Sequence, residues 1–195
     1  NDEIIGEIPI DALASKAPMY DRKWTKTKLP EKKIKTKELK KIKLEDAFLK
    51  ILSSPNHSNK SWVTEQFDQM VMTDTAQKSG GNAAVIRIHK KEKSIAVTVD
   101  SSANYCKAHP LTGGKQIVCE SWRNLISVGA KPLAITNCLN FGNPESPKVM
   151  GEFAECLLGL KEACEFLDYP VVSGNVSFYN GTNKKNIDPT PVIGG

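Results

Sequence analysis

The sequence has no apolar run long enough to cross a membrane, and nothing near Asn1 resembles a signal peptide. Its mean hydropathy is −0.36, and 25% of its residues are charged. The sequence therefore predicts a cytoplasmic protein that does not associate with membranes.

The cysteine and histidine spacing of a metal site is also missing. No pair of the five cysteines is spaced C-x-x-C, and the three histidines form no cluster. An odd number of scattered cysteines favours reduced thiols, several of which we expect to pack as small apolar side chains. No histidine is obviously placed to activate one of them as a nucleophile. The five are Cys106, Cys119, Cys138, Cys156 and Cys164.

Aromatic residues are too few around the most basic segment to suggest base stacking. Between Asp21 and Lys43 the chain carries 11 lysines and arginines against three acids, flanked only by Tyr20 and Trp24. Such a run is either a nucleic-acid footprint or a solvated linker that repels itself and stays extended. We favour the linker and expect no nucleic-acid partner. Since the formal net charge is only +5, the rest of the chain is slightly acidic.

A length of 195 residues, 39% of them hydrophobic, predicts one domain with an appendage. Apolar periodicity predicts a short amphipathic helix at 44–52, with a short helix or turn at 60–69. The pattern from residue 70 onward is α+β. We expect strands at 83–89, 94–100, 132–137, 170–179 (bent at Gly174) and from 191, and helices at 115–128 and 146–167.

Three clusters rich in asparagine and glycine are expected in loops that follow strands. They are Ser79–Asn82, Asn137–Pro144 and Ser173–Ser177. Glycine lets a backbone approach a phosphate closely, and an asparagine oxygen can bind a hard cation. Two such loops could hold a nucleotide with magnesium, although Asn-Gly sequences are also ordinary turn chemistry.

The order and spacing of these clusters resemble a known family. The segments TVDSSANYCKAHPLTGGKQIVCESWRNLISVGAKPLAITNCLNFGNPESP, PVVSGNVSFYN and PTPVIG are similar to phosphoribosylformylglycinamidine synthase. This resemblance is strong over residues 60–195 and weak over GEIPIDALASKAPMYDRKW. It implies a ligase of purine biosynthesis that uses ATP, Mg²⁺ and ammonia from a glutaminase subunit or domain to convert formylglycinamide ribonucleotide to the amidine.

The same resemblance implies how the chain is divided. Residues 1–24 would be the tail of a preceding C-terminal domain, and 25–59 a basic linker with a short helix. Residues 60–195 would be an aminoimidazole-ribonucleotide-synthase-like N-terminal domain, truncated at its C-terminal end. The family's catalytic histidine region lies upstream of this segment. We therefore expect no catalytic residue here and an inactive piece on its own.

Site residues follow from the resemblance by position. Asn137 and Gly174 match ATP contacts, Asn175 a magnesium ligand and Ser177 a substrate contact. Asn137 stands where the family often has aspartate, which weakens the case for tight metal binding because hard cations favour charged oxygens.

A further departure is Asn82, which also stands where the family often has aspartate. Arg123 and Asn124 resemble the second-half counterpart of an Arg-Asp pair that binds substrate and metal; helix packing or exposure is an equally good account of Arg123. Asp100 and Glu120 are the nearby acids and secondary metal candidates, with strand-end capping and solvent exposure as the alternative.

The fold implied is α+β and ferredoxin-like, with two antiparallel helices on one face of a four-stranded sheet. In the family, two such domains pair their sheets into a barrel-like core. We expect the isolated piece to imitate that pairing as a C2 homodimer. An alternative function is a non-catalytic, structural nucleotide-binding and dimerisation half of the enzyme, which asparagines in place of carboxylates favour.

Overall fold

The computed structural model describes residues 3–28 and 41–195, so the middle of the lysine-rich segment lies outside the described residues. Its largest sheet has four strands in the order β4-β9-β5-β6, with bounds Val99–Ser101, Thr190–Gly194, Ile135–Asn140 and Val171–Ser177. β9 pairs antiparallel with both β4 and β5, whereas β5 and β6 are parallel.

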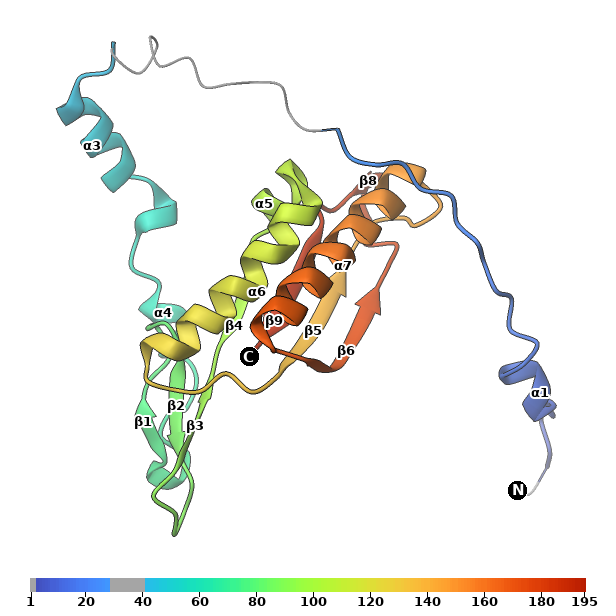
Figure 1. The fold of residues 1–195 in the computed structure, drawn as a ribbon, viewed down its shortest axis with the longest axis horizontal. Coiled ribbons are helices and arrows are strands. Elements are labelled where there is room, and N and C mark those ends of the chain that lie inside the picture. The colour runs from blue at the N-terminus through green and yellow to red at the C-terminus, as the bar shows by residue number, and fades with distance from the viewer. Residues whose placement is uncertain (1–2, 29–40) are drawn as a thin grey trace.

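Two long helices lie side by side on one face of this sheet (Figure 1). They are α6, Pro110–Ser127, and α7, Pro147–Leu167, and both begin with a proline at the position where a missing N–H costs nothing. Their backbones approach closely at Gly114 and Gly159. A Cβ at Gly159 would overlap the carbonyl oxygen of Leu111, and one at Gly114 would overlap that of Cys156. The helices and the sheet enclose one apolar core.

The two helices over a four-stranded sheet are as expected, but the ferredoxin-like topology is not. That topology runs β-α-β-β-α-β. Here the four strands and two long helices run β4-α6-β5-α7-β6-β9, with α5 (Ala103–Ala108) before α6. A helical crossover is what two parallel neighbouring strands require, and α7 supplies it between β5 and β6. The domain is therefore α+β with a mixed sheet.

A second, antiparallel sheet contains β1 (Thr75–Gln77), β2 (Ala84–Arg87) and β3 (Ser94–Val97) in that order. The single strand expected at 94–100 is thus divided between two sheets, as β3 and β4. Thr98, at the junction, is buried and exchanges two backbone hydrogen bonds with Gly195, of 3.0 and 3.1 Å. This pairing turns the chain from one sheet into the other.

Shorter elements complete the described chain. The expected helix at 44–52 is confirmed as α3, Leu44–Leu52, and no residue of it is buried. An unexpected hairpin joins β7 and β8. None of the helices in the ranges 3–28 and 41–195 is long and apolar enough to cross a membrane. The remaining elements are α1 (Ile10–Leu13), η1 (Pro55–His57), α4 (Ser61–Thr64), η2 (Val71–Thr73), β7 (Gly181–Thr182) and β8 (Lys185–Asn186).

Residues 25–28, which we call the strap, lie across α7 (Figure 1). The Thr25 N–H donates to the Pro147 carbonyl (3.0 Å), and the Thr27 N–H donates to Glu155 Oε2 (2.8 Å). Glu155 is only 3% exposed, so this carboxylate uses a backbone donor to satisfy a buried oxygen. The sequence placed these residues in a solvated linker; the structure attaches them to the domain.

Candidate functional site

The two later asparagine-glycine clusters lie largely within strands rather than in loops. In the parallel β5–β6 pair, Asn137 is opposite Gly174, Cys138 opposite Asn175, and Asn140 opposite Ser177. All four predicted site residues are therefore on adjacent strands, β6 being an edge of the sheet. The expectation that they occupy loops after the strands was wrong: β5 extends to Asn140, beyond the predicted end at 137, and β6 runs through the whole of Ser173–Ser177, within the strand predicted at 170–179.

Strand geometry divides these four residues into two pairs. Because successive side chains in a strand point to opposite faces, Asn137 and Gly174 share one face, and Asn175 and Ser177 share the other. A Cβ at Gly174 would overlap Asn137 Oδ1, so the amide lies directly over the glycine. One ligand reaches both pairs only by passing around the exposed edge of β6.

The Asn175 and Ser177 pair lies on the face that α6 and α7 leave open. Ser177 Oγ accepts a hydrogen bond from Asn180 Nδ2 at 3.0 Å, which fixes the hydroxyl. The Asn175 side chain is exposed and makes no hydrogen bond within the described part of the chain. Its carbonyl oxygen is therefore available to a cation, and the serine hydroxyl to a polar ligand.

A cavity of about 460 Å³ brings together the second group of candidates. Asn82, Asp100, Glu120 and Asn124 all line it, where the glycine loop at 79–82 faces α6. Asp100 is 8% exposed, and its Oδ1 accepts from Asn124 Nδ2 at 2.7 Å. Arg123 does not line this cavity.

Thr98 is the residue of this cavity that the sequence analysis missed. Its Oγ1 lies 2.8 Å from Asp100 Oδ2 and 3.2 Å from the Asn82 carbonyl. A polar residue inside the apolar run at 94–99 was the available signal. Only two carboxylates line the cavity, and no group of three or more His, Cys, Asp or Glu suited to a metal occurs in the described ranges. A cation here would need amide oxygens as well.

The cysteines pack as expected. Cys106 and Cys156 are completely buried, one on α5 and one on α7. A hydrogen bond with Cys106, together with burial, raises the pKa of the Cys156 thiol far above its usual range. A thiol that stays protonated is a poor nucleophile.

Comparison with known proteins identifies the fold. Residues 80–195 match the family described as AIR synthase related protein, N-terminal domain. The chain belongs to this family. The match begins at the glycine loop and includes both groups of candidate residues.

Similarity to individual proteins extends over the whole chain. It is 59% identical over 196 residues to phosphoribosylformylglycinamidine synthase subunit PurL of Pelagibacter ubique, covering 100% of this chain and 27% of that protein. The PurL subunit of Rhodopseudomonas palustris is 49% identical over 193 residues, covering 98% of this chain and 26% of that protein. These identities confirm the resemblance stated from the sequence. The chain spans about a quarter of the length of these relatives.

A solved structure agrees with this similarity. The PurLQS structure from Thermotoga maritima superposes with a TM-score of 0.75 at 36% identity, covering 99% of this chain and 30% of that one. T. maritima PurL complexed with ATP gives a TM-score of 0.71 at 36% identity, over 98% and 29% of the two chains.

Proposed function

We propose that this chain is part of a phosphoribosylformylglycinamidine synthase, an ATP-dependent carbon–nitrogen ligase of purine biosynthesis. The observation that carries the proposal is 59% identity to a PurL subunit along the entire chain. The reaction converts formylglycinamide ribonucleotide and ammonia to the amidine at the expense of ATP, in the cytoplasm. Structures of T. maritima PurL with ATP and with FGAR (formylglycinamide ribonucleotide) support the binding of both ligands by the whole protein.

Ammonia would come from glutamine through a glutaminase partner. The named PurLQS assembly of T. maritima supports a complex of PurL with other subunits. Within the whole protein, we assign residues 1–24 to a preceding domain, 25–59 to a connecting segment and 60–195 to the synthase-like domain. The strap contacts are an exception within this segment, because 25–28 are attached to α7.

The four strand residues retain the roles inferred from the resemblance: Asn137 and Gly174 toward ATP, Asn175 toward Mg²⁺ and Ser177 toward the substrate. Magnesium, when bound, would neutralise phosphate charge. The geometry supports separate duties for the two pairs. Gly174 leaves room for the Asn137 amide to lie against β6, whereas the open face presents an amide oxygen beside a hydroxyl.

Turnover by the whole protein tests this assignment through Asn175. Replacing Asn175 with alanine removes an exposed oxygen donor, so we expect a large loss of turnover with unchanged melting temperature. Asn175→Asp keeps the oxygen and should restore magnesium-dependent activity. Asn56→Ala, an exposed asparagine on η1, is the matched control. Full turnover of the alanine variant would refute the assignment.

A second candidate is a structural nucleotide-binding role for this half of the enzyme. The cavity around Asp100 favours it, since a buried carboxylate and Asn124 line a space of about 460 Å³. For this role, Asp100→Asn should lower the melting temperature measured with ADP and Mg²⁺. Its turnover should stay close to that of the parent protein. A variant that loses turnover without any change in nucleotide-dependent melting would exclude this role.

We also propose that the chain on its own is inactive and forms a C2 homodimer through the open sheet. Val99 on β4 and Val172 on β6 are 72% and 70% exposed, and both strands are sheet edges. Exposed apolar edge strands favour pairing with a second copy. Light scattering that gives a monomeric mass at high concentration would overturn this proposal.

A further inference from the structure

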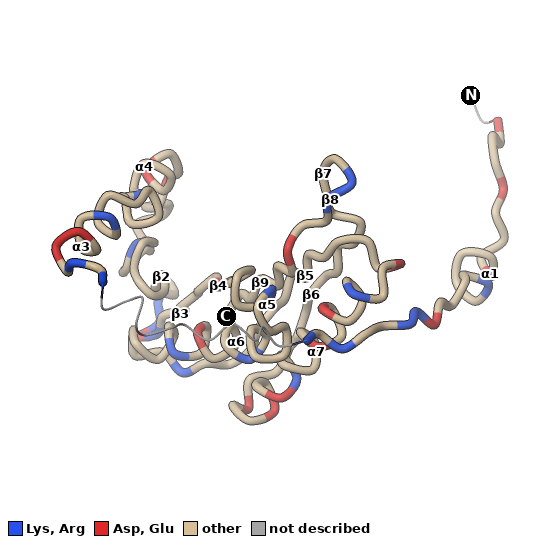
Figure 2. Tube along the Cα trace, turned by 90° about the horizontal axis from the view of Figure 1, so that it is seen from above, with Lys and Arg blue, Asp and Glu red and all other residues tan. Residues whose placement is uncertain are grey.

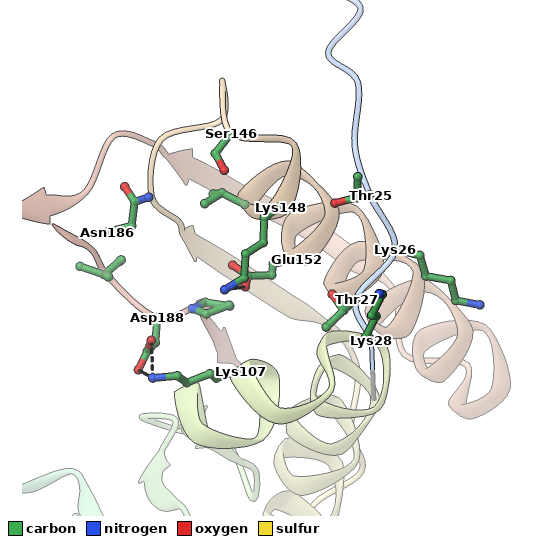
Figure 3. Close-up of a pocket in the computed structure, with 13 residues that line it drawn as sticks. Thr25, Lys26, Thr27, Lys28, Lys107, Ser146, Lys148, Glu152, Asn186 and Asp188 are labelled. Atoms are coloured by element: carbon green, nitrogen blue, oxygen red, sulfur yellow. Dashed lines mark hydrogen bonds and ion pairs between the residues drawn. The ribbon is translucent and has the colours of Figure 1, made fainter. Parts of the chain in front are cut away.

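A cavity of about 780 Å³ lies between the strap and the domain, away from both candidate sites (Figure 3). Its walls come from four places in the sequence: the strap, the end of α5, the first turns of α7, and residues 186–189, which begin at the last residue of β8. Neither the four strand residues nor the Asp100 group contributes to it. Its volume is typical of small-molecule sites.

The strap is a fixed wall of this cavity rather than a loose cover. Its two backbone hydrogen bonds to Pro147 and Glu155 hold it against α7. Gly151 lets it come that close, because a Cβ at this position would overlap the Thr25 carbonyl oxygen. A glycine inside a helix is otherwise unfavourable. The cavity is therefore formed before any ligand arrives.

Lysines contribute positive charge to the cavity from three of its walls. Lys107 and Lys148 reach it from α5 and α7, and Lys28 from the strap, whereas Lys26 points away (Figure 3). Basic residues also recur along the chain segment that approaches α7 (Figure 2). The first turn of α7 contains no acid and supplies the positive end of its helix dipole. These features together favour an anion such as a phosphate group.

Two carboxylates provide the complementary part of the cavity. Asp188 pairs with Lys107 at 3.0 Å, and Glu152 lies 3.8 Å from Lys148. Glu152 is only 9% exposed and makes no closer ionic or hydrogen-bonded contact within the described residues. Burial raises the pKa of its carboxyl, an effect that Lys148 opposes. In dinucleotide-binding folds, a carboxylate near the phosphate site accepts a hydrogen bond from a ribose hydroxyl.

We propose that the cavity beneath the strap binds a sugar phosphate, with Lys107 and Lys148 on the phosphate and Glu152 on a sugar hydroxyl. This site is additional to the proposed ligase function. It depends on residues that the ligase assignment does not use. Failure of one proposal therefore leaves the other standing.

Calorimetric titration of the 195-residue chain with ribose 5-phosphate, inorganic phosphate and ribose tests the proposal. We expect saturable binding of ribose 5-phosphate, about tenfold or more weaker binding of phosphate, and none of ribose. Lys107→Ala and Lys148→Ala should each weaken ribose 5-phosphate about tenfold, as expected for loss of one charge-assisted hydrogen bond. Both lysines are well exposed, so neither change should unfold the domain.

Lys161→Ala is the matched control, since it removes an exposed lysine from the same helix without lining the cavity. Unchanged affinity in this control supports a specific site. Equal weakening by all three lysine substitutions would mean diffuse electrostatic attraction and overturn the proposal. Equal affinities for phosphate and ribose 5-phosphate would also overturn it, because the cavity would then hold only a bare anion.

Discussion

Gly151→Ala is expected to release the strap while leaving the domain folded. The substitution adds a single methyl group on the face of α7 where the strap crosses. That methyl would overlap the carbonyl oxygen of Thr25. The overlap is with backbone, so it cannot be relieved by rotating a side chain. The strap can move away because residues 3–24, which precede it, form no hydrogen bond or ion pair with the rest of the described chain.

The size of the effect follows from the two hydrogen bonds that would be lost. The Thr25–Pro147 bond joins neutral groups and contributes about 1 kcal/mol, and the Thr27–Glu155 bond involves a carboxylate and contributes about 2 kcal/mol. A total of about 3 kcal/mol corresponds to more than a 100-fold shift toward the released strap. Alanine improves helix propensity by about 1 kcal/mol, so the free energy of unfolding should fall by only about 2 kcal/mol and the domain should stay folded.

Hydrogen–deuterium exchange measures this release directly. The amides of Thr25 and Thr27 should exchange about 100-fold faster in Gly151→Ala, and trypsin should cleave after Lys26 and Lys28 more readily. Lys161→Ala, on the exposed side of the same helix, should leave both measurements unchanged. If the Gly151 variant is folded and the strap amides remain equally protected, the steric argument is refuted.

Three further substitutions test the site and its surroundings. Gly174→Ala should destabilise the domain by about 1–3 kcal/mol in denaturant unfolding, because its Cβ would overlap Asn137 Oδ1. Adding Asn137→Ala should recover part of that loss. If the free-energy changes of the two single substitutions simply add in the double variant, the proposed overlap is contradicted. Asp100→Ala should lower the free energy of unfolding by about 1–3 kcal/mol for each donor left unpaired, on Asn124 and Thr98. Asp100→Asn should lower it less, because one acceptor oxygen remains. Equal losses in the two variants would contradict this hydrogen-bond scheme. Burial raises the pKa of Glu152 above its usual value of 4.5, so ionisation of this carboxyl opposes folding. Glu152→Gln should therefore melt at a higher temperature than the parent at pH 7, and this gain should disappear as the pH falls below about 4.5. A gain that persists at low pH would refute the electrostatic cause.

The long helices and the sheet were predictable because their signals are local. The helical pattern predicts a helix at 146–167, and α7 occupies Pro147–Leu167. The strand at 94–100 was predicted as one piece since its β-branched residues alternate without a break. Only long-range pairing of Thr98 with Gly195 divides it, and no local pattern contains that information.

The strap shows a different limit of sequence reasoning. Charge patterning predicts a solvated segment, and Lys26 does point away from the domain. The attachment depends on the backbone N–H groups of Thr25 and Thr27. Almost every residue has such a group, so the amino-acid composition gives no sign of the attachment. The complementary signal was on the other partner: Gly151 and Glu155 are a glycine and a buried acid in the middle of a helix, and neither residue favours that position without a close neighbour.

The candidate site itself could be predicted as a set of residues but not as an arrangement. Asn137, Gly174, Asn175 and Ser177 were identified from motif order, and the register brings all four together. Motif order does not reveal that Gly174 and Asn175 lie on opposite faces, because that follows only from their being inside a strand. The consequence is chemical: an edge strand with ligand groups on both faces can bind one extended ligand around its open edge. We therefore expect pairing of a second chain along the β6 edge to compete with ligands that contact both Gly174 and Asn175, whereas pairing through β4 would leave them accessible.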